Sequence, residues 1–158
     1  MREILFRGQT RRYGQKVNMA GEKQPGKWVY GGIFPGTGDY SVIYGAEAEE
    51  FTGADIDKYT VYSDTVGQYT GLKDKNGKRI FEGDIIQTER DLFGGENKKE
   101  REIFNSVAFY DTKSACFGLK SNKYRCLPLR RFKGDFNEII GNVHDNPELL
   151  KGGEADGN

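Results

Sequence analysis

Short runs of alternating aromatic and β-branched residues, separated by glycine-containing turns, recur along this chain. In the clearest run, Tyr40, Val42 and Tyr44 fall on one face at a spacing of two. Glycine supplies the positive φ angles at which strands reverse, and aromatic side chains suit a pleated surface. With 22 glycines, 10 Phe and 9 Tyr among 158 residues, the sequence predicts a mainly β protein.

The first 66 residues predict an N-terminal β-meander, the first region of the chain. Gly31 and Gly32 are expected to bulge or bend the second strand, and residues 34–39 carry dense turn chemistry. Residues 46–51 could form one helical turn, and the polar residues 7–27 read as a long hairpin loop or a mobile excursion. Strands are expected at 4–6, 27–30, 40–44 and 58–62.

Residues 67–150 predict a C-terminal SH3-like small barrel, because five short strands are joined by corners and not by crossover helices. Asn76-Gly77 favours a two-residue type I′ hairpin. Gly83 permits a sharp corner, at which the Asp84 carboxylate can accept backbone amide hydrogens. Further strands are expected at 106–110, 115–119 and 138–143, with an exposed hairpin loop over 92–101.

The end of the chain predicts a short C-terminal helix followed by a disordered tail. Asn146 is a suitable cap, Pro147 suits the first helical position, and Glu148 provides an early acid. The tail, residues 151–158, consists mostly of glycine and acids.

Charge and cysteine content predict a soluble protein of the cytoplasm. The 24 basic and 24 acidic side chains cancel, so no whole-chain field attracts a polyanion or an anionic membrane. The chain lacks a run of about 18 apolar residues, and its first apolar stretch is too short for a signal peptide. Cys116 and Cys126 favour free thiols in a reducing compartment, with a reversible bridge as the minor alternative.

Three segments of this sequence resemble the YopX family, and together they span nearly the whole chain. The central one is Thr65–Ile85, which contains Tyr69-Thr70-Gly71-Leu72, Asn76-Gly77 and Ile80-Phe81-Glu82-Gly83-Asp84. The others are Ile4–Gly8 with Trp28–Gly31, and Ile139–Val143 with Asn146–Leu150. The resemblance implies a bacteriophage or prophage protein of a bacterial host cell, β-rich with an SH3-like C-terminal barrel. It also implies homo-oligomers, and it carries no catalytic residues over to this chain.

The residues that could support catalysis or metal binding have simpler interpretations. His144 is the only histidine and is expected at the surface or as a cap. Glu82 and Asp84 flank Gly83, and a corner-capping Asp beside a solvated Glu is favoured over a paired-carboxylate metal site. The Asp74 loop is unlike a calcium loop, because Lys78 occupies a ligand position. We therefore predict no enzyme activity, no cofactor and no metal.

A basic segment with interleaved aromatics is the candidate nucleic-acid site. Such residues on a small barrel could contact phosphates and stack on bases, although a solvated strand–loop–strand face is the favoured alternative. The candidate residues are Lys120, Lys123, Tyr124, Arg125, Arg130, Arg131 and Lys133.

The sequence thus leaves two functional hypotheses. The first is a non-enzymatic interaction module that self-associates through an aromatic β surface, with a second copy of itself as partner. The alternative is a nucleic-acid-binding accessory protein that uses the segment from Lys120 to Lys133. Neither hypothesis involves a membrane.

Overall fold

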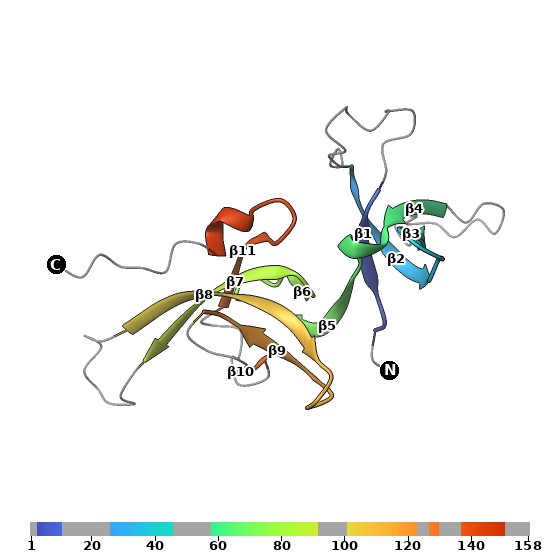
Figure 1. The fold of residues 1–158 in the computed structure, drawn as a ribbon. Helices are drawn as coiled ribbons and strands as arrows, with labels where there is room; N and C mark the ends of the chain where they lie inside the picture. The colour runs from blue at the N-terminus through green and yellow to red at the C-terminus, as the bar shows by residue number, and fades with distance from the viewer. Residues whose placement is uncertain are drawn as a thin grey trace. The chain divides into compact units, whose positions relative to one another are not determined.

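The structure, a computed structural model, describes residues 3–10, 26–45, 58–91, 101–122, 127–129 and 137–150 (Figure 1). Within these ranges the chain forms β-strands and two short 3-10 turns, η1 (Ser63–Thr65) and η4 (Pro147–Leu150). The strands are β1 (Phe6–Gln9), β2 (Trp28–Phe34), β3 (Tyr40–Gly45), β4 (Lys58–Tyr62), β5 (Gly67–Lys73), β6 (Arg79–Phe81), β7 (Asp84–Asp91), β8 (Arg101–Asp111), β9 (Cys116–Lys120), β10 (Leu127–Pro128) and β11 (Asn137–Asn142). The prediction of a mainly β protein is confirmed.

The strands form two sheets, and the chain divides into two compact units, Met1–Tyr69 and Thr70–Asn158. The six-stranded sheet has the order β4-β3-β2-β1-β5-β6, and the five-stranded sheet has the order β10-β9-β8-β7-β11. No described helix is long and apolar enough to cross a bilayer. The SH3-like closure, the meander and the region boundary at residue 66 stay predictions.

The core of the first unit is a small apolar cluster of Val29, Ile43 and Val61. These side chains come from neighbouring strands, whose β-branched residues suit the pleated surface. An isolated bridge between Thr10 and Val61 also brings the end of β1 to β4, so the sheet curls over this cluster. Thr65 fastens the curl, because its hydroxyl accepts the Gln9 amide hydrogen and donates to the Tyr62 carbonyl.

Two details of the first unit differ from the sequence prediction. Gly31 and Gly32 do not form a bulge, since the register of β2 with β3 runs through both without a shift, while a bend at these glycines stays a prediction. The first strand begins at Phe6 and extends into the segment predicted as a loop. Arg7 of this strand is buried, and its guanidinium carbon lies 4.8 Å from the centre of the Trp28 ring, which is a cation–π contact.

The second unit has a larger core, made of Ile80, Ile86, Ala108, Leu119 and Leu129. The β7–β8 hairpin crosses this core and is the longest pairing in the described chain. Two buried hydroxyl groups have partners inside the unit: the Thr88 hydroxyl donates to the Asn137 side-chain oxygen, and the Ser106 hydroxyl donates to the Ile86 carbonyl. The unit is thus fixed by a few internal hydrogen bonds as well as by apolar packing.

The predicted C-terminal helix is only a 3-10 turn, Pro147–Leu150. Its Leu149 amide donates to the Asn146 carbonyl, three residues earlier, and four residues are too few to build an α-helix. The turn lies against β8, where the Asn105 side-chain amide donates to the Leu149 carbonyl. The predictions for residues 46–51, for the loop over 92–100 and for the tail 151–158 fall outside the described residues.

Candidate functional site

The basic segment is described at one of its candidate residues. Lys120 ends β9 and is exposed, opposite Val107 of β8. Lys123, Tyr124, Arg125, Arg130, Arg131 and Lys133 lie outside the described residues. Whether these seven side chains form one surface therefore stays a prediction.

The Asp74 carboxylate organises the hairpin between β5 and β6. Its Oδ1 accepts the amide hydrogens of Asn76 and Lys78, at 2.9 and 2.8 Å, and its Oδ2 accepts that of Ile139 in β11, at 3.2 Å. Asp74 is 5% exposed, so these contacts replace the water that would otherwise solvate the charge. The carboxylate therefore acts as a structural connector between the hairpin loop and an edge strand.

The prediction of a type I′ turn at this hairpin is wrong. A type I′ turn needs positive φ at both central residues, whereas here Gly77 has a φ of 80° and Asn76 does not have a positive φ. Instead, the Gly77 amide donates to the Asp74 carbonyl and the Asp74 amide donates to the Lys78 carbonyl. This is a type I turn followed by a glycine bulge, in which an Asp at the first position is favoured by its side-chain acceptor.

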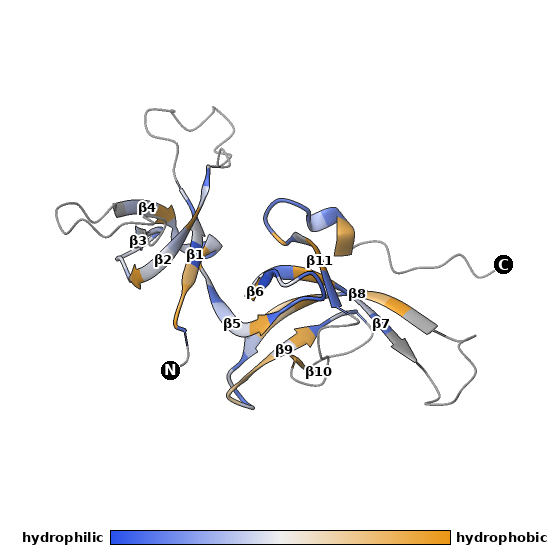
Figure 2. Ribbon diagram, turned by 180° about the vertical axis from the view of Figure 1, so that it is seen from behind, coloured by the Kyte–Doolittle hydropathy of each residue, from blue (hydrophilic) through white to orange (hydrophobic). Residues whose placement is uncertain are grey.

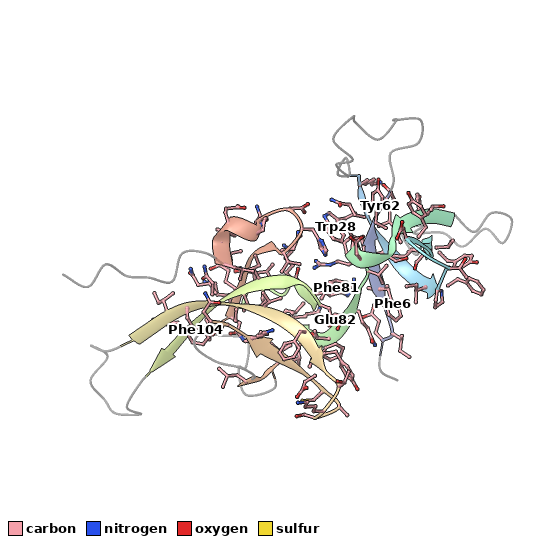
Figure 3. All side chains as sticks on the ribbon, viewed as in Figure 1. Phe6, Trp28, Tyr62, Phe81, Glu82 and Phe104 are labelled. Carbon is pink, nitrogen blue, oxygen red and sulfur yellow. The ribbon has the colours of Figure 1, made fainter. Side chains whose placement is uncertain are left out.

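The corner between β6 and β7 matches the capping interpretation. Asp84 is buried, and its Oδ2 accepts the Phe81 amide hydrogen at 2.8 Å across Gly83, which has a φ of 80°. Glu82 is half-buried at the same corner (Figure 3), where its Oε1 accepts the Tyr110 amide hydrogen at 3.1 Å. Both carboxylates serve the backbone, and no cluster of three His, Cys, Asp or Glu that could hold a metal occurs among the described residues.

His144 is exposed in the turn that follows β11, as predicted. The turn is built by Asn142, whose side-chain oxygen accepts the amide hydrogens of His144 and Asp145 and whose side-chain nitrogen donates to Asp145. Gly141 comes directly before Asn142, and a larger residue would not fit at this position, because its Cβ would lie 2.6 Å from the Asn146 side-chain oxygen. The signature at the end of the chain therefore encodes a turn.

Two exposed carboxylates have lowered pKa values. A hydrogen bond from Lys75 lowers the pKa of Glu138, and the two side chains form an ion pair at 2.5 Å. A hydrogen bond from the Ser114 side chain, helped by the Lys113 amide, lowers the pKa of Asp111 in the β8–β9 turn. Both groups support hairpin loops.

Cys116, which begins β9, is a free cysteine, and Cys126 lies outside the described residues.

One feature of the second unit was missed by sequence reasoning. The strand pair β7–β8 runs past its neighbours, since β9 pairs with β8 only from Val107 onward and β11 pairs with β7 only up to Thr88. We call the projecting part, residues 89–91 of β7 and 101–106 of β8, the arm (Figure 1). Ile103 on the arm is 62% exposed. The signal was the opposite charge of residues that the register sets opposite each other, Arg90 with Glu102 and Asp91 with Arg101.

Comparison with known families identifies the chain. The family model described as YopX protein matches residues 20–151, which is most of the sequence. The chain belongs to the YopX family. No curated protein sequence matches this YopX-family chain. Among solved structures, it is similar to the crystal structure of protein EF1440 from Enterococcus faecalis, with 21% sequence identity, a TM-score of 0.47, and coverage of 95% of this chain and 99% of that one.

Proposed function

We propose that this YopX-family chain is a non-enzymatic interaction module that binds a second copy of itself. The observation that carries the proposal is the exposure of large apolar side chains on strands. On β8, Ile103 is 62% exposed and Tyr110 is 43% exposed. Figure 2 shows a hydrophobic stretch, in orange, on this strand. Apolar side chains of this size gain free energy when a partner removes them from water.

Charge supports the same proposal. The formal net charge is zero, so two copies approach each other without whole-molecule repulsion. The carboxylates that were weighed as catalytic candidates, Glu82 and Asp84, accept backbone amide hydrogens and so contribute to the corner. Such groups would have to give up those contacts to act on a substrate, which supports a non-enzymatic role.

The origin and location belong to the same proposal. The three matching segments support a bacteriophage or prophage origin, and the SH3-like barrel is the closure expected for residues 67–150. The free Cys116 thiol fits a reducing compartment, the cytoplasm of the bacterial host.

Sedimentation velocity over a concentration series from low micromolar to millimolar tests self-association. We expect the weight-average sedimentation coefficient to rise with concentration. A purified full-length chain that stays monomeric over the whole series would contradict the proposal.

A second candidate function is nucleic-acid binding by the basic segment. The observation that favours it is the exposed Lys120 at the end of β9, immediately before the other six candidates in the sequence. The affinity for single-stranded DNA would then fall steeply with added salt, because phosphate contacts release counterions. Fluorescence anisotropy at low and high salt measures this affinity.

The matched variant replaces Lys123, Arg125, Arg130 and Arg131 with Ala. Under the second candidate function it loses both the binding and its salt dependence. Equal binding by the variant, or no binding by the natural chain at low salt, would rule this candidate out.

A further inference from the structure

The backbone of β8 presents an open edge along the arm. Among the described residues, Arg101–Ser106 pair only with β7, whereas Val107–Asp111 lie between β7 and β9. An open edge exposes a row of backbone donors and acceptors, which is a template for pairing with another strand. Phe104, labelled in Figure 3, marks the arm on β8.

The direction of these backbone groups follows from two hydrogen bonds. The Ala108 carbonyl accepts the Gly83 amide hydrogen, and the Tyr110 amide donates to Glu82, so even-numbered residues of β8 point their polar groups toward the β7 side. Backbone groups alternate along a strand, so those of Ile103 and Asn105 point away from β7. The open edge therefore offers the amides and carbonyls of odd-numbered residues.

We propose that two copies of the chain pair through this edge, antiparallel and centred on Ile103. This inference rests on the proposed function and names the surface that self-association uses. A two-fold axis at Ile103 sets this residue opposite its own copy and sets Arg101 opposite Asn105, with about six backbone hydrogen bonds between the copies. The Ile103 side chain, 62% exposed in one copy, then packs across the pair against its copy.

The sequence of β8 favours this register over the two registers that are shifted by one residue. Residues with outward-pointing groups must face one another, so the axis moves along β8 in steps of one residue. One step toward the core sets Arg101 opposite Val107, which is already paired with Lys120 of β9. One step toward the tip sets Glu102 opposite Glu102, and like charges directly opposite are destabilising. The register centred on Ile103 avoids both conflicts.

The joined sheet would be continuous across the two copies. In this pairing two five-stranded sheets, each in the order β10-β9-β8-β7-β11, meet through β8 of each copy along the arm. The interface is narrow, because five residues a side carry it, and we therefore expect a weak dimer that dissociates on dilution. The zero net charge leaves no long-range repulsion to prevent it.

Two substitutions test the edge without entering the core. Ile103→Lys places a charge where two copies would face each other, and Ile103→Pro removes an outward amide that β7 does not use. The control is Phe34→Lys, which adds the same charge at a side chain with the same 62% exposure in the other unit. We expect the natural chain and Phe34→Lys to dimerise alike, and both Ile103 variants to stay monomeric at more than tenfold higher concentration. Circular dichroism confirms that each variant is folded.

Amide hydrogen exchange at low and high concentration gives the second measurement. Dimerisation should protect the Ile103 and Asn105 amides, while the Phe104 amide, which points to β7, should exchange at the same rate at both concentrations. A monomeric natural chain at all concentrations removes both the inference and the proposed function. Two results would rule out the β8 edge as the interface but not self-association itself. In one, the natural chain associates while exchange at Ile103 is unchanged; in the other, the Ile103 variants still associate. Protection at Ile103 that is independent of concentration would assign the edge to a segment of the same chain and overturn the inference.

Discussion

The two units keep their strands together in different ways, although both are made of short antiparallel strands. In Met1–Tyr69 the strands approach one another at glycines. A Cβ on Gly8 would lie 2.9 Å from the Val61 side chain, and a Cβ on Gly31 would meet the Tyr44 carbonyl oxygen. The apolar cluster beneath is small, so close backbone approach substitutes for side-chain volume.

In Thr70–Asn158 buried polar side chains hold the corners and edges. Asp74 joins the β5–β6 loop to β11, Asp84 caps the corner before β7, and Thr88 bonds Asn137 across the β7–β11 pair. The apolar core of this unit is also larger, with five buried residues. Its carboxylates accept backbone amides that no strand pairing would satisfy.

This difference predicts opposite sensitivities. The first unit should respond to added volume at Gly31, because the neighbour displaced there is the Tyr44 backbone, which has little freedom to move. The second unit should respond to loss of an acceptor, because each amide left without a partner keeps its desolvation penalty. A substitution that adds volume at a glycine of the first unit, and one that removes an acceptor in the second unit, would test this contrast.

Gly31→Ala should have the largest effect. The new methyl group would overlap the Tyr44 carbonyl and force β2 and β3 apart, which should cost about 3 kcal/mol in the free energy of unfolding. Gly32→Ala is the adjacent control, since a Cβ there meets nothing within 4 Å. Fluorescence of Trp28, the only tryptophan, follows urea unfolding of this unit. If the two variants unfolded at the same urea midpoint, the close approach of strands at glycines would not be what distinguishes the first unit.

Asp74→Ala should have the next largest effect, on the other unit. It removes the acceptor of the Asn76, Lys78 and Ile139 amides and should lower the free energy of unfolding by about 2 kcal/mol. Asp74→Asn should lower the free energy of unfolding by less than Asp74→Ala does. Its side-chain oxygen can still accept the amide hydrogens of the turn, but its amide nitrogen then faces the Ile139 donor. Amide exchange at the buried core residues Ile86 and Leu119 measures the loss.

Asp111→Ala is the matched control for Asp74→Ala. Asp111 also accepts the amide of the residue two positions on, Lys113, but it does so in a solvent-exposed turn. Water can replace its carboxylate there, so we expect a much smaller change in exchange at the same core residues. If the two alanine variants were equally destabilised, burial of the acceptor would not be what distinguishes the second unit.

The sequence predicted those features of the fold whose chemistry is local. The corner at Gly83 and Asp84 lies within a few residues, so the positive φ and the carboxylate acceptor could both be inferred. The type of the Asn76-Gly77 turn could not be inferred from these two residues. It is determined by Asp74, which lies outside the Asn-Gly pair. Asp74 also contacts Ile139, 65 residues away, a partner that no local pattern reveals.

The candidate site was predicted less well than the fold. The sequence predicts a loop that ends at Arg101 and a strand only from residue 106, whereas β8 begins at Arg101 and pairs with β7 from there to Val107. The exposure of Ile103 depends on where β9 ends, which sequence periodicity does not give. Of the seven candidate residues in the basic segment, Lys120 alone lies within the described chain, so that surface stays a prediction.

Glu138→Gln should have the smallest effect and separates exposed from buried carboxylates in the second unit. A hydrogen bond from Lys75 lowers the pKa of Glu138, so its contribution to stability is present above the ordinary pKa of about 4.3 and disappears as the pH falls through the lowered value. The natural chain should therefore be slightly more stable than the variant at neutral pH, and the two should converge in acid. High salt should also reduce the difference, since an exposed ion pair is screened. Thermal unfolding across this pH range, with Lys75→Gln as a second variant, measures the effect. A difference that persisted unchanged in acid would mean that Glu138 acts by packing and not by its charge.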